Sequence, residues 1–215
     1  MITLVLNTVD PLAEVAVFSK QGTVLAEKTQ AEIKLRPSQV IFALMQEALA
    51  AAAVSLEDLG AVVTNIGPGS FTGIRLSLAA AAGLTLSADI PMIGVTYFEA
   101  VAEDSNAEAG KLVILRSGKR DFFVGQVGAP LEGVVQVSAD NIVGHIPSGQ
   151  AVLAPDHHVA ADLANRGVQV VGLQDAVQVN LYRASLRKTA SAEIPDPVYI
   201  RGADVSFSRN AKTPA

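Results

Sequence analysis

The sequence predicts an α/β protein of two similar halves, each a mixed β-sheet with flanking helices, the second half being a degenerate copy of the first. In each half, short apolar strands separated by tight turns come first, and helices and strands then alternate. A polar stretch of small residues at positions 104–107 separates the halves. Half of the 215 residues are hydrophobic and 17% are charged, which is enough apolar material for one large domain or two smaller ones.

The first half has the predicted order β-β-β-α-β-α-β. Three runs that alternate or are continuously apolar predict an antiparallel meander over residues 2–7, 14–19 and 23–28. Pro37 opens a helix that extends to residue 52, with Val40 and Leu44 on its apolar side. A buried strand at 61–66, a helix at 72–86 and a strand at 91–95 follow. This order is that of the ribonuclease-H-like half of the actin-like (ASKHA) architecture.

The second half repeats the pattern after a connecting helix at 97–109. A second meander is predicted over residues 111–116, 121–126 and 134–137, followed by strands at 151–154 and 168–171 with a helix at 158–166 between them. A last helix is predicted at 181–191, and the chain is extended from Pro195. We therefore expect subdomains at 1–98 and 99–205 and a mobile tail at 206–215.

The most informative segment is the glycine-rich turn between the strand at 61–66 and the helix that follows. Gly67 and Gly69 permit positive φ or a close backbone approach, and Pro68 pre-sets a tight turn. Ser70 or Thr72 can cap the helix. Such a turn at a helix N-terminus is a natural anion-binding site.

Known phosphate and nucleophile motifs fit this turn poorly. A P-loop needs Lys-Ser/Thr after its last glycine, but Gly73 is followed by Ile-Arg. The dinucleotide fingerprint and the hydrolase elbow both need a glycine where Thr72 stands. We therefore interpret Ser70 as a cap and predict no catalytic residue.

The first hairpin is also a poor phosphate site. It carries Asn7 where a carboxylate would hold the water around magnesium, and it has no glycine for close approach. An actin-fold ATPase or phosphotransferase that uses the turn 67–73 is nevertheless kept as the alternative function.

Metal, thiol and nucleic-acid chemistry have little support. There is no cysteine, and His145, His157 and His158 lack the spacing of a helical metal site. We expect neither a metal nor a cofactor. The net charge of −5 and the 5% aromatic content argue against a nucleic-acid surface. Arg183, Arg187 and the neighbouring lysine are interpreted as a solvated face, with contact to RNA phosphate as the alternative.

The helix at 72–86 carries one charge, Arg75, and is otherwise made of Leu, Ala, Gly, Ser, Thr and Ile. A helix that is apolar on all sides is buried on more than one side. It is either the inner helix of a three-layer fold, or it packs on the sheet with one side and on another protein with the other. We expect no membrane span and no signal peptide, and therefore a cytoplasmic protein.

The block from Gly67 to Arg75, with Leu78, Gly83 and the segments 88–95 and 197–201, resembles the signature of the TsaB (YeaZ) family. These TsaD-like, formerly glycoprotease-like proteins take part in threonylcarbamoyladenosine synthesis on tRNA. The resemblance implies two actin-like subdomains and a non-catalytic subunit that pairs with TsaD, helps to recruit TsaE, and forms a homodimer when alone. Contact with tRNA would be indirect.

The resemblance and the apolar helices together predict a partner interface. The residues expected there are Gly67, Pro68, Gly69, Ser70, Phe71, Thr72, Gly73, Arg75, Leu76, Ser77, Ala79, Ala80, Gly83, Val40 and Leu44. Three positions depart from the family pattern. Asn7 replaces an aspartate, Arg36 stands where a histidine is common, and Arg116 begins the second hairpin in place of Asp-Ala-Arg.

Overall fold

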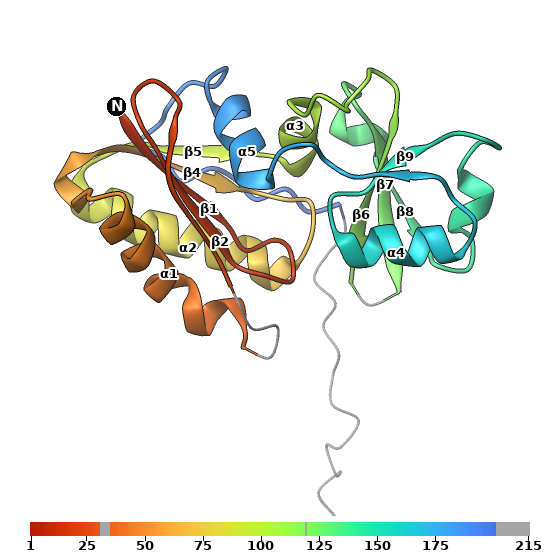
Figure 1. Ribbon diagram of the computed structural model, residues 1–215, viewed down its shortest axis with the longest axis horizontal. Helices are drawn as coiled ribbons and strands as arrows, with labels where there is room; N and C mark the ends of the chain where they lie inside the picture. Colours follow the sequence, from red (N-terminus) through yellow and green to blue (C-terminus); the bar gives the residue numbers. More distant parts are fainter. Residues whose placement is uncertain (31–34, 119, 201–215) are drawn as a thin grey trace, which may run out of the picture.

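The computed structural model describes residues 1–30, 35–118 and 120–200. Two five-stranded sheets, one in each half of the chain, lie side by side with helices around them (Figure 1). This confirms the predicted α/β class with two subdomains. The predicted mobile tail at 206–215 lies outside the described residues, as do the basic residues that the sequence carries there.

The first sheet has the strand order β3-β2-β1-β4-β5. Its strands are β1 (Ile2–Asn7), β2 (Glu14–Phe18), β3 (Val24–Thr29), β4 (Leu59–Asn65) and β5 (Met92–Val95). The first three strands are antiparallel because short turns join them, whereas β4 and β5 follow helical crossovers and run parallel to β1. The predicted meander is therefore confirmed.

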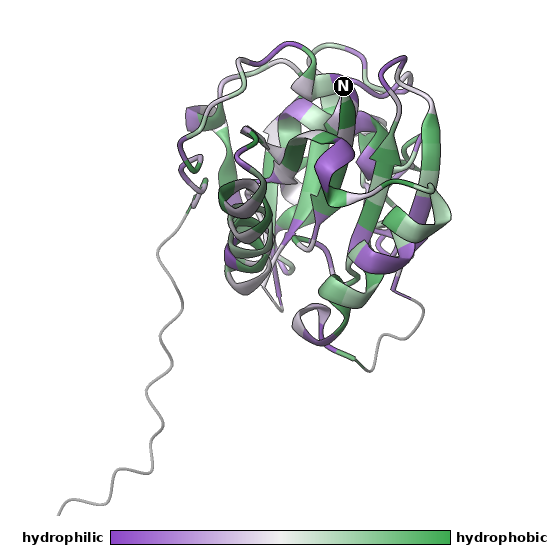
Figure 2. Cartoon of the chain, turned by 90° about the vertical axis from the view of Figure 1, so that its left-hand side faces the viewer, coloured by the Kyte–Doolittle hydropathy of each residue, from purple (hydrophilic) through white to green (hydrophobic). Residues whose placement is uncertain are grey.

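Helices cover both faces of this sheet. On one face lie α1 (Pro37–Ala51) and α2 (Phe71–Ala88), and on the other α5 (Val177–Ser185) with α3 (Tyr97–Ala102) beside it (Figure 1). The strands alternate accordingly: Leu4 packs in the core shared with α1 and α2, whereas Val5 packs in the core shared with α5. Figure 2 shows the hydrophobic residues concentrated on the strands between these layers.

The second sheet has the order β10-β9-β6-β7-β8, the same neighbour relations as the first sheet. Its strands are β6 (Leu112–Ser117), β7 (Asp121–Gln126), β8 (Val135–Ser138), β9 (Val152–Leu153) and β10 (Val170–Val171). The helix α4 (His157–Asn165) joins β9 to β10. A 3-10 helix at Ile142–His145 stands where the first half has α1, so the second half is the degenerate copy. Two further 3-10 turns lie at Leu56–Asp58 and Leu131–Gly133.

Two helices differ from the sequence prediction. The helix α3 ends at Ala102 instead of residue 109, and α5 spans Val177–Ser185 instead of residues 181–191. Gln178 and Asn180 are buried in α5, so polar side chains face the core and hide the apolar period on which the prediction relied. Although α5 follows the second sheet in sequence, it packs on the first, where Phe18 stacks on Tyr182 with ring centroids 4.2 Å apart.

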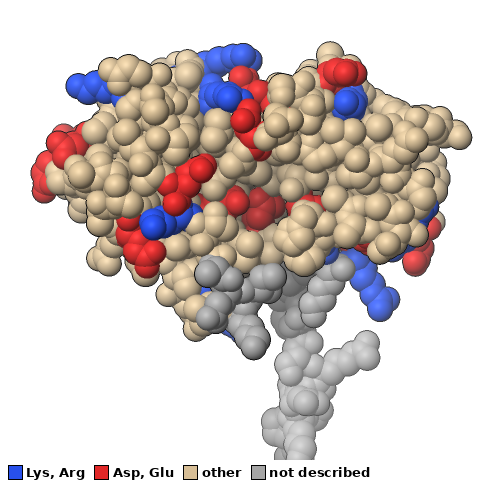
Figure 3. All heavy atoms as spheres, in the orientation of Figure 1, with Lys and Arg blue, Asp and Glu red and all other residues tan. Residues whose placement is uncertain are grey.

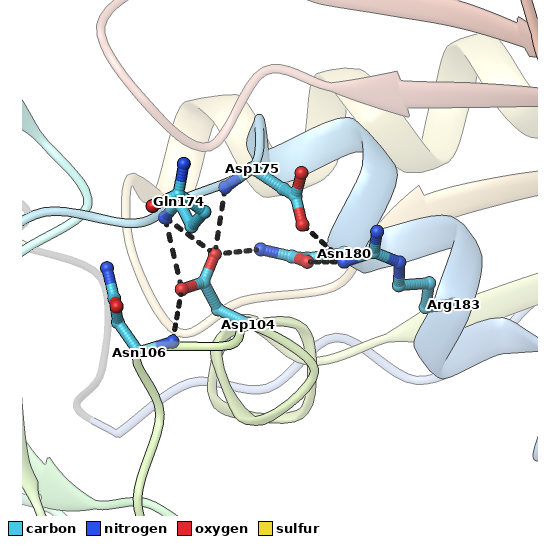
Figure 4. Close-up of polar contacts among 6 residues, drawn as sticks. All are labelled: Asp104, Asn106, Gln174, Asp175, Asn180 and Arg183. Carbon is cyan, nitrogen blue, oxygen red and sulfur yellow. Dashed lines mark hydrogen bonds and ion pairs between the residues drawn. The ribbon is translucent and has the colours of Figure 1, made fainter.

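The chain therefore crosses between the halves twice, and one carboxylate joins the two crossings (Figure 4). Asp104 accepts hydrogen bonds from the backbone N–H of Asn106 (3.0 Å), Gln174 (2.9 Å) and Asp175 (3.0 Å) and from the side-chain amide of Asn180 (3.1 Å). Burial alone raises the pKa of this carboxyl, but the donors outweigh burial and leave the pKa below its ordinary value. Asp104 thus holds the two crossing segments together by hydrogen bonds.

By length and composition α2 could cross a membrane. Its packing is that of a core helix, because one face is buried against the sheet. The buried residues are Gly73, Ile74, Ser77, Leu78, Ala80, Ala81 and Thr85.

Candidate partner surface and cleft

The turn between β4 and α2 is built as the sequence predicts. Gly67 has φ of 101°, in the region that favours glycine, and a Cβ at this position would meet the carbonyl oxygen of Val198. Ser70 caps α2, since its Oγ accepts a hydrogen bond from the N–H of Gly73 at 3.2 Å. The capping role assigned to Ser70 is therefore confirmed.

The first hairpin closes directly on the start of α2. The Thr8 hydroxyl donates to the carbonyl of Gly73 at 2.7 Å, and the Thr8 N–H donates to Ser77 Oγ at 3.1 Å. A Cβ at Gly73 would overlap the Thr8 carbonyl, so glycine is required for this close approach. Gly73 and Ser77 hold the hairpin to the helix inside the chain.

Six residues of the predicted partner interface have little exposed surface. Gly67, Pro68, Gly73, Ser77, Ala80 and Leu44 are all buried within the chain itself. They expose little surface in the single chain, and their contact with a partner stays a prediction. Their packing positions the exposed residues of the same segments.

Four of the remaining predicted residues form one continuous face of α2. Thr72, Arg75, Ala79 and Gly83 are exposed and recur at helical spacing, and Leu86 extends the same face with 74% of its surface exposed. Ser70 is exposed as well, whereas Gly69, Phe71, Leu76 and Val40 are half-buried. We call this face, residues 72, 75, 79, 83 and 86, the α2 face. On neighbouring α1, Phe42 is 59% exposed, a residue that sequence reasoning missed.

A cavity of about 920 Å³ lies between the two halves. Its walls come from the first hairpin, the start of α1, the turn 67–73, the β6–β7 hairpin and residues 198–200. Both hairpins contribute, so the cavity depends on how the subdomains sit together. This is the cleft to which the alternative function would belong.

Carboxyl groups gather beside the cleft, in a small adjoining pocket lined by Asp10, Glu14 and Asp156, whereas the charged residues that line the cleft itself are Asp10, Arg36 and Arg116. Figure 3 marks the acidic and basic residues on this side of the molecule. The Asn7 amide donates to Asp10 Oδ2 at 2.9 Å and to Glu14 Oε2 at 2.8 Å, and the Tyr97 hydroxyl donates to Asp10 at 2.7 Å. Burial raises the pKa of Asp10 to about 6 and that of Glu14 to about 7, with the Asp156 charge adding to the first and the Asp10 charge to the second. Burial likewise raises the pKa of Tyr97.

Two departures from the family pattern are explained by this cluster. An aspartate at position 7 would place a third carboxylate between Asp10 and Glu14, whereas Asn7 supplies a donor to both. Arg116 donates from Nε to Asp156 at 3.1 Å, and Asp156 also caps α4. Nothing in the structure explains the third departure, Arg36, whose N–H binds Gln39 at the start of α1.

The cleft carries charges of both signs. Asp10 would repel a phosphate, whereas Arg36 and Arg116 would attract one, and Ser70 Oγ already accepts the N–H of Gly73 at the start of α2. His157 and His158 begin α4 with their rings 3.9 Å apart. Within residues 1–30, 35–118 and 120–200, no three carboxylate, histidine or cysteine side chains are arranged to hold a metal ion.

The basic residues of the α5 region are engaged within the chain. Arg183 pairs with Asp175, Arg187 pairs with Glu103 at 2.7 Å, and Lys188 pairs with Glu99 at 2.9 Å. Each cation is matched by a carboxylate, which weakens the RNA-contact alternative.

Two subdomains of the same strand order, joined at a cleft, define the chain as an actin-like protein. Comparison with known sequences adds the family. The sequence model described as "TsaD: tRNA N6-adenosine threonylcarbamoyltransferase" matches residues 32–208, and the chain belongs to this family. Its resemblance to TsaB within that family is confirmed by curated relatives.

The Escherichia coli K12 protein named tRNA threonylcarbamoyladenosine biosynthesis protein TsaB is 34% identical over 115 residues, which cover 52% of this chain and 47% of the relative. The chain thus aligns with about half the length of the curated relatives it matches. A Pseudomonas aeruginosa structure described as similar to peptidase YeaZ has a TM-score of 0.70 at 18% identity, covering 93% of this chain and 99% of that one. EutJ from Carboxydothermus hydrogenoformans has a TM-score of 0.52 at 11% identity, covering 86% and 88%. These two structures support the fold.

Proposed function

We propose that this chain is a non-catalytic scaffold subunit for threonylcarbamoyladenosine formation on tRNA, next to the anticodon. It pairs with a TsaD homologue, helps to recruit a TsaE homologue, and forms a homodimer when alone. Its contact with tRNA is indirect, and it works in the cytoplasm. The names of the curated relatives and the TsaD family match support the pathway.

The observation that carries the pairing is the α2 face. It exposes Ala79, Gly83 and Leu86 on a helix whose single charge is Arg75. A solvent-facing helix normally carries a charged face, and stable subunit interfaces resemble a protein core cut in two. A partner that covers this face explains its composition.

The scaffold role rests on the chemistry of the cleft. Ser70 already accepts the N–H of Gly73 at the start of α2, and the turn has no Lys-Ser/Thr pair to hold phosphates and magnesium. The alternative, an ATPase or phosphotransferase, is separated by calorimetric titration of the isolated chain with Mg-ATP. Micromolar binding that Asp10→Ala changes would favour the alternative.

The test is reconstitution of tRNA modification with the TsaD and TsaE homologues of the same organism. We expect modified adenosine to form with the wild-type chain and to be lost when it is omitted. Gly83→Leu is expected to lose both TsaD binding and modification while keeping the fold, since among the described residues outside the helix's own backbone none lies within 4 Å of a Cβ at Gly83. Full modification with Gly83→Leu at wild-type affinity would contradict the proposal.

A further inference from the structure

The first two residues of α3 contact different halves of the chain. The Tyr97 hydroxyl donates to Asp10 Oδ2 of the first hairpin at 2.7 Å. The ring of Phe98 lies so close to β7 in the second half that a Cβ at Gly125 would overlap it. The helix α3 therefore forms the joint at which the two halves meet (Figure 1).

A small pocket of about 90 Å³ lies across this joint, beside the main cleft. The first half lines it with Asp10 and Glu14, and the second half lines it with Asp156, His157 and His158. Because both halves form its walls, the pocket exists only while the joint is closed. A turn of one half away from the other would open these groups to water.

Neutral groups provide the hydrogen bonds to the two carboxyls of the first half. The Asn7 amide donates to Asp10 Oδ2 at 2.9 Å and to Glu14 Oε2 at 2.8 Å, and the Tyr97 hydroxyl also donates to Asp10. Neither donor carries the positive charge that stabilises a buried carboxylate. None of the ion pairs between residues that the structure describes includes Asp10 or Glu14.

Most of the charges that face these two carboxyls are negative. Asp10 is faced by Asp156, which disfavours its ionised form, and by Arg116, which favours it but is paired with Asp156 at 3.1 Å. Glu14 is faced by Asp10 and by Glu27 of β3. Burial, together with these negative charges, raises the pKa of Asp10 to about 6 and that of Glu14 to about 7. Ionisation of Asp10 and Glu14 is therefore costly while the joint is closed.

We propose that protonation of Asp10 and Glu14 controls the joint. While both carboxyls are protonated, the two halves stay closed over the small pocket. When the carboxyls release their protons to solvent, the halves turn apart about α3 and the main cleft widens. Asp104 and the core that joins Leu6 to Val113 keep the halves attached, so the motion is that of a hinge.

The direction of the effect follows from proton linkage. The closed form binds both protons more tightly than an open form in which water reaches the carboxyls, so closing is favoured at low pH. The pKa of Glu14 is raised from 4.5 to about 7, and across this range the closed form is progressively lost as pH rises. Glu14 alone then changes the ratio of open to closed chains by up to about a hundredfold.

The test is the distance between two nitroxide labels in the full chain, measured by double electron–electron resonance. The chain has no cysteine, so Gln46→Cys on α1 and Ala161→Cys on α4 give one exposed label in each half. Dilution with unlabelled chain restricts the signal to distances within one molecule. We expect the fraction of chains with the longer distance to grow severalfold between about pH 5 and about pH 8.

Variants that cannot ionise should remain closed. Asp10→Asn combined with Glu14→Gln is expected to keep the short distance at every pH. Glu14→Gln alone should lose the part of the change above about pH 6, because only Asp10 still titrates. Glu132→Gln removes an exposed carboxyl of the second half and is the matched control, with an unchanged response.

The two histidines of the pocket are tested separately. His157→Gln combined with His158→Gln should retain the pH response, and thermal unfolding at about pH 5 checks that every variant folds. Should the double carboxyl variant fail to fold, Glu14→Gln alone decides. If the histidine variant abolishes the response, or if Glu14→Gln responds as wild type does, the assignment to the carboxyls is wrong. If the wild-type distances are the same at every pH, the joint is rigid and the hinge is wrong.

Discussion

At the scale of single residues, Asn7 joins two carboxyl groups beside the cleft. Its amide is the shared donor for Asp10 and Glu14, two partly buried carboxyls whose pKa values lie near 6 and 7. A third carboxylate in this position would be strongly destabilising.

Glu14→Gln is expected to change how stability depends on pH. Burial raises the pKa of Glu14 from 4.5 to about 7, so the native state binds a proton more tightly than the unfolded state does. The stabilisation from that proton is complete below the ordinary pKa and is lost as pH rises through about 7. The uncharged glutamine side chain would still accept the hydrogen bond from the Asn7 amide.

The measurement is urea unfolding of both proteins at about pH 5 and about pH 8. The variant should be more stable than wild type at the higher pH, by on the order of 1–3 kcal/mol, and similar at the lower. The groups that face Glu14 and Asp10 include Asp156, Arg116 and Tyr97, and they are unchanged in the variant. Identical pH profiles for the two proteins would show that Glu14 is ionised normally.

At the scale of elements, α2 has two faces with opposite requirements. Gly73 lies against the Thr8 carbonyl, whereas a Cβ at Gly83 would meet no atom within 4 Å. The same residue type therefore serves packing in one turn of the helix and leaves an open surface in another.

Alanine at these two glycines should have opposite effects. Gly73→Ala forces a Cβ into the first hairpin and should lower the free energy of unfolding by roughly 2 kcal/mol or more. Gly83→Ala should raise it by up to about 1 kcal/mol, since alanine is the better helix former. Thermal unfolding of the two variants tests this directly, and equal shifts in one direction would argue against the assigned faces.

Sequence reasoning predicted most elements because their apolar periods are regular. The β1–β3 meander, α1, the β4 strand, the Ser70 cap and α2 are all as expected. The start of α5 was missed because its core face carries Gln178 and Asn180. The burial of Gly73, Ser77 and Ala80 was missed because small residues signal a close neighbour without saying whether the neighbour is the same chain. The Asp10–Glu14 pair and Asp104 gave no signal, since long-range donors create their environments.

At the scale of the whole molecule, the connection between the subdomains depends on Asp104. The carboxylate holds the crossing after α3 to the crossing before α5, and α5 in turn lies on the first sheet (Figure 4). A core that joins Leu6 of the first sheet to Val113 of the second sheet is a further link between the two halves.

Asp104→Ala should lower the free energy of unfolding by about 2–4 kcal/mol, because four donors lose a charged acceptor. Asp104→Asn keeps one acceptor oxygen and should cost less. The lowered pKa of Asp104 adds stability above its ordinary pKa that is lost as pH falls. Denaturant unfolding at neutral pH measures the free energy of unfolding of both variants. A smaller loss for Asp104→Ala than for Asp104→Asn would contradict the role assigned to the Asp104 carboxylate.

The account depends on a partner covering the α2 face, and the most direct measurement is the affinity of the full chain for its TsaD homologue by titration calorimetry. Wild type should bind, and Ala79→Arg should weaken binding by about a hundredfold while its unfolding temperature stays within a few degrees of wild type, since Ala79 is exposed. Ala80→Arg is unsuitable because Ala80 is buried. Equal affinity of Ala79→Arg and wild type would contradict the account.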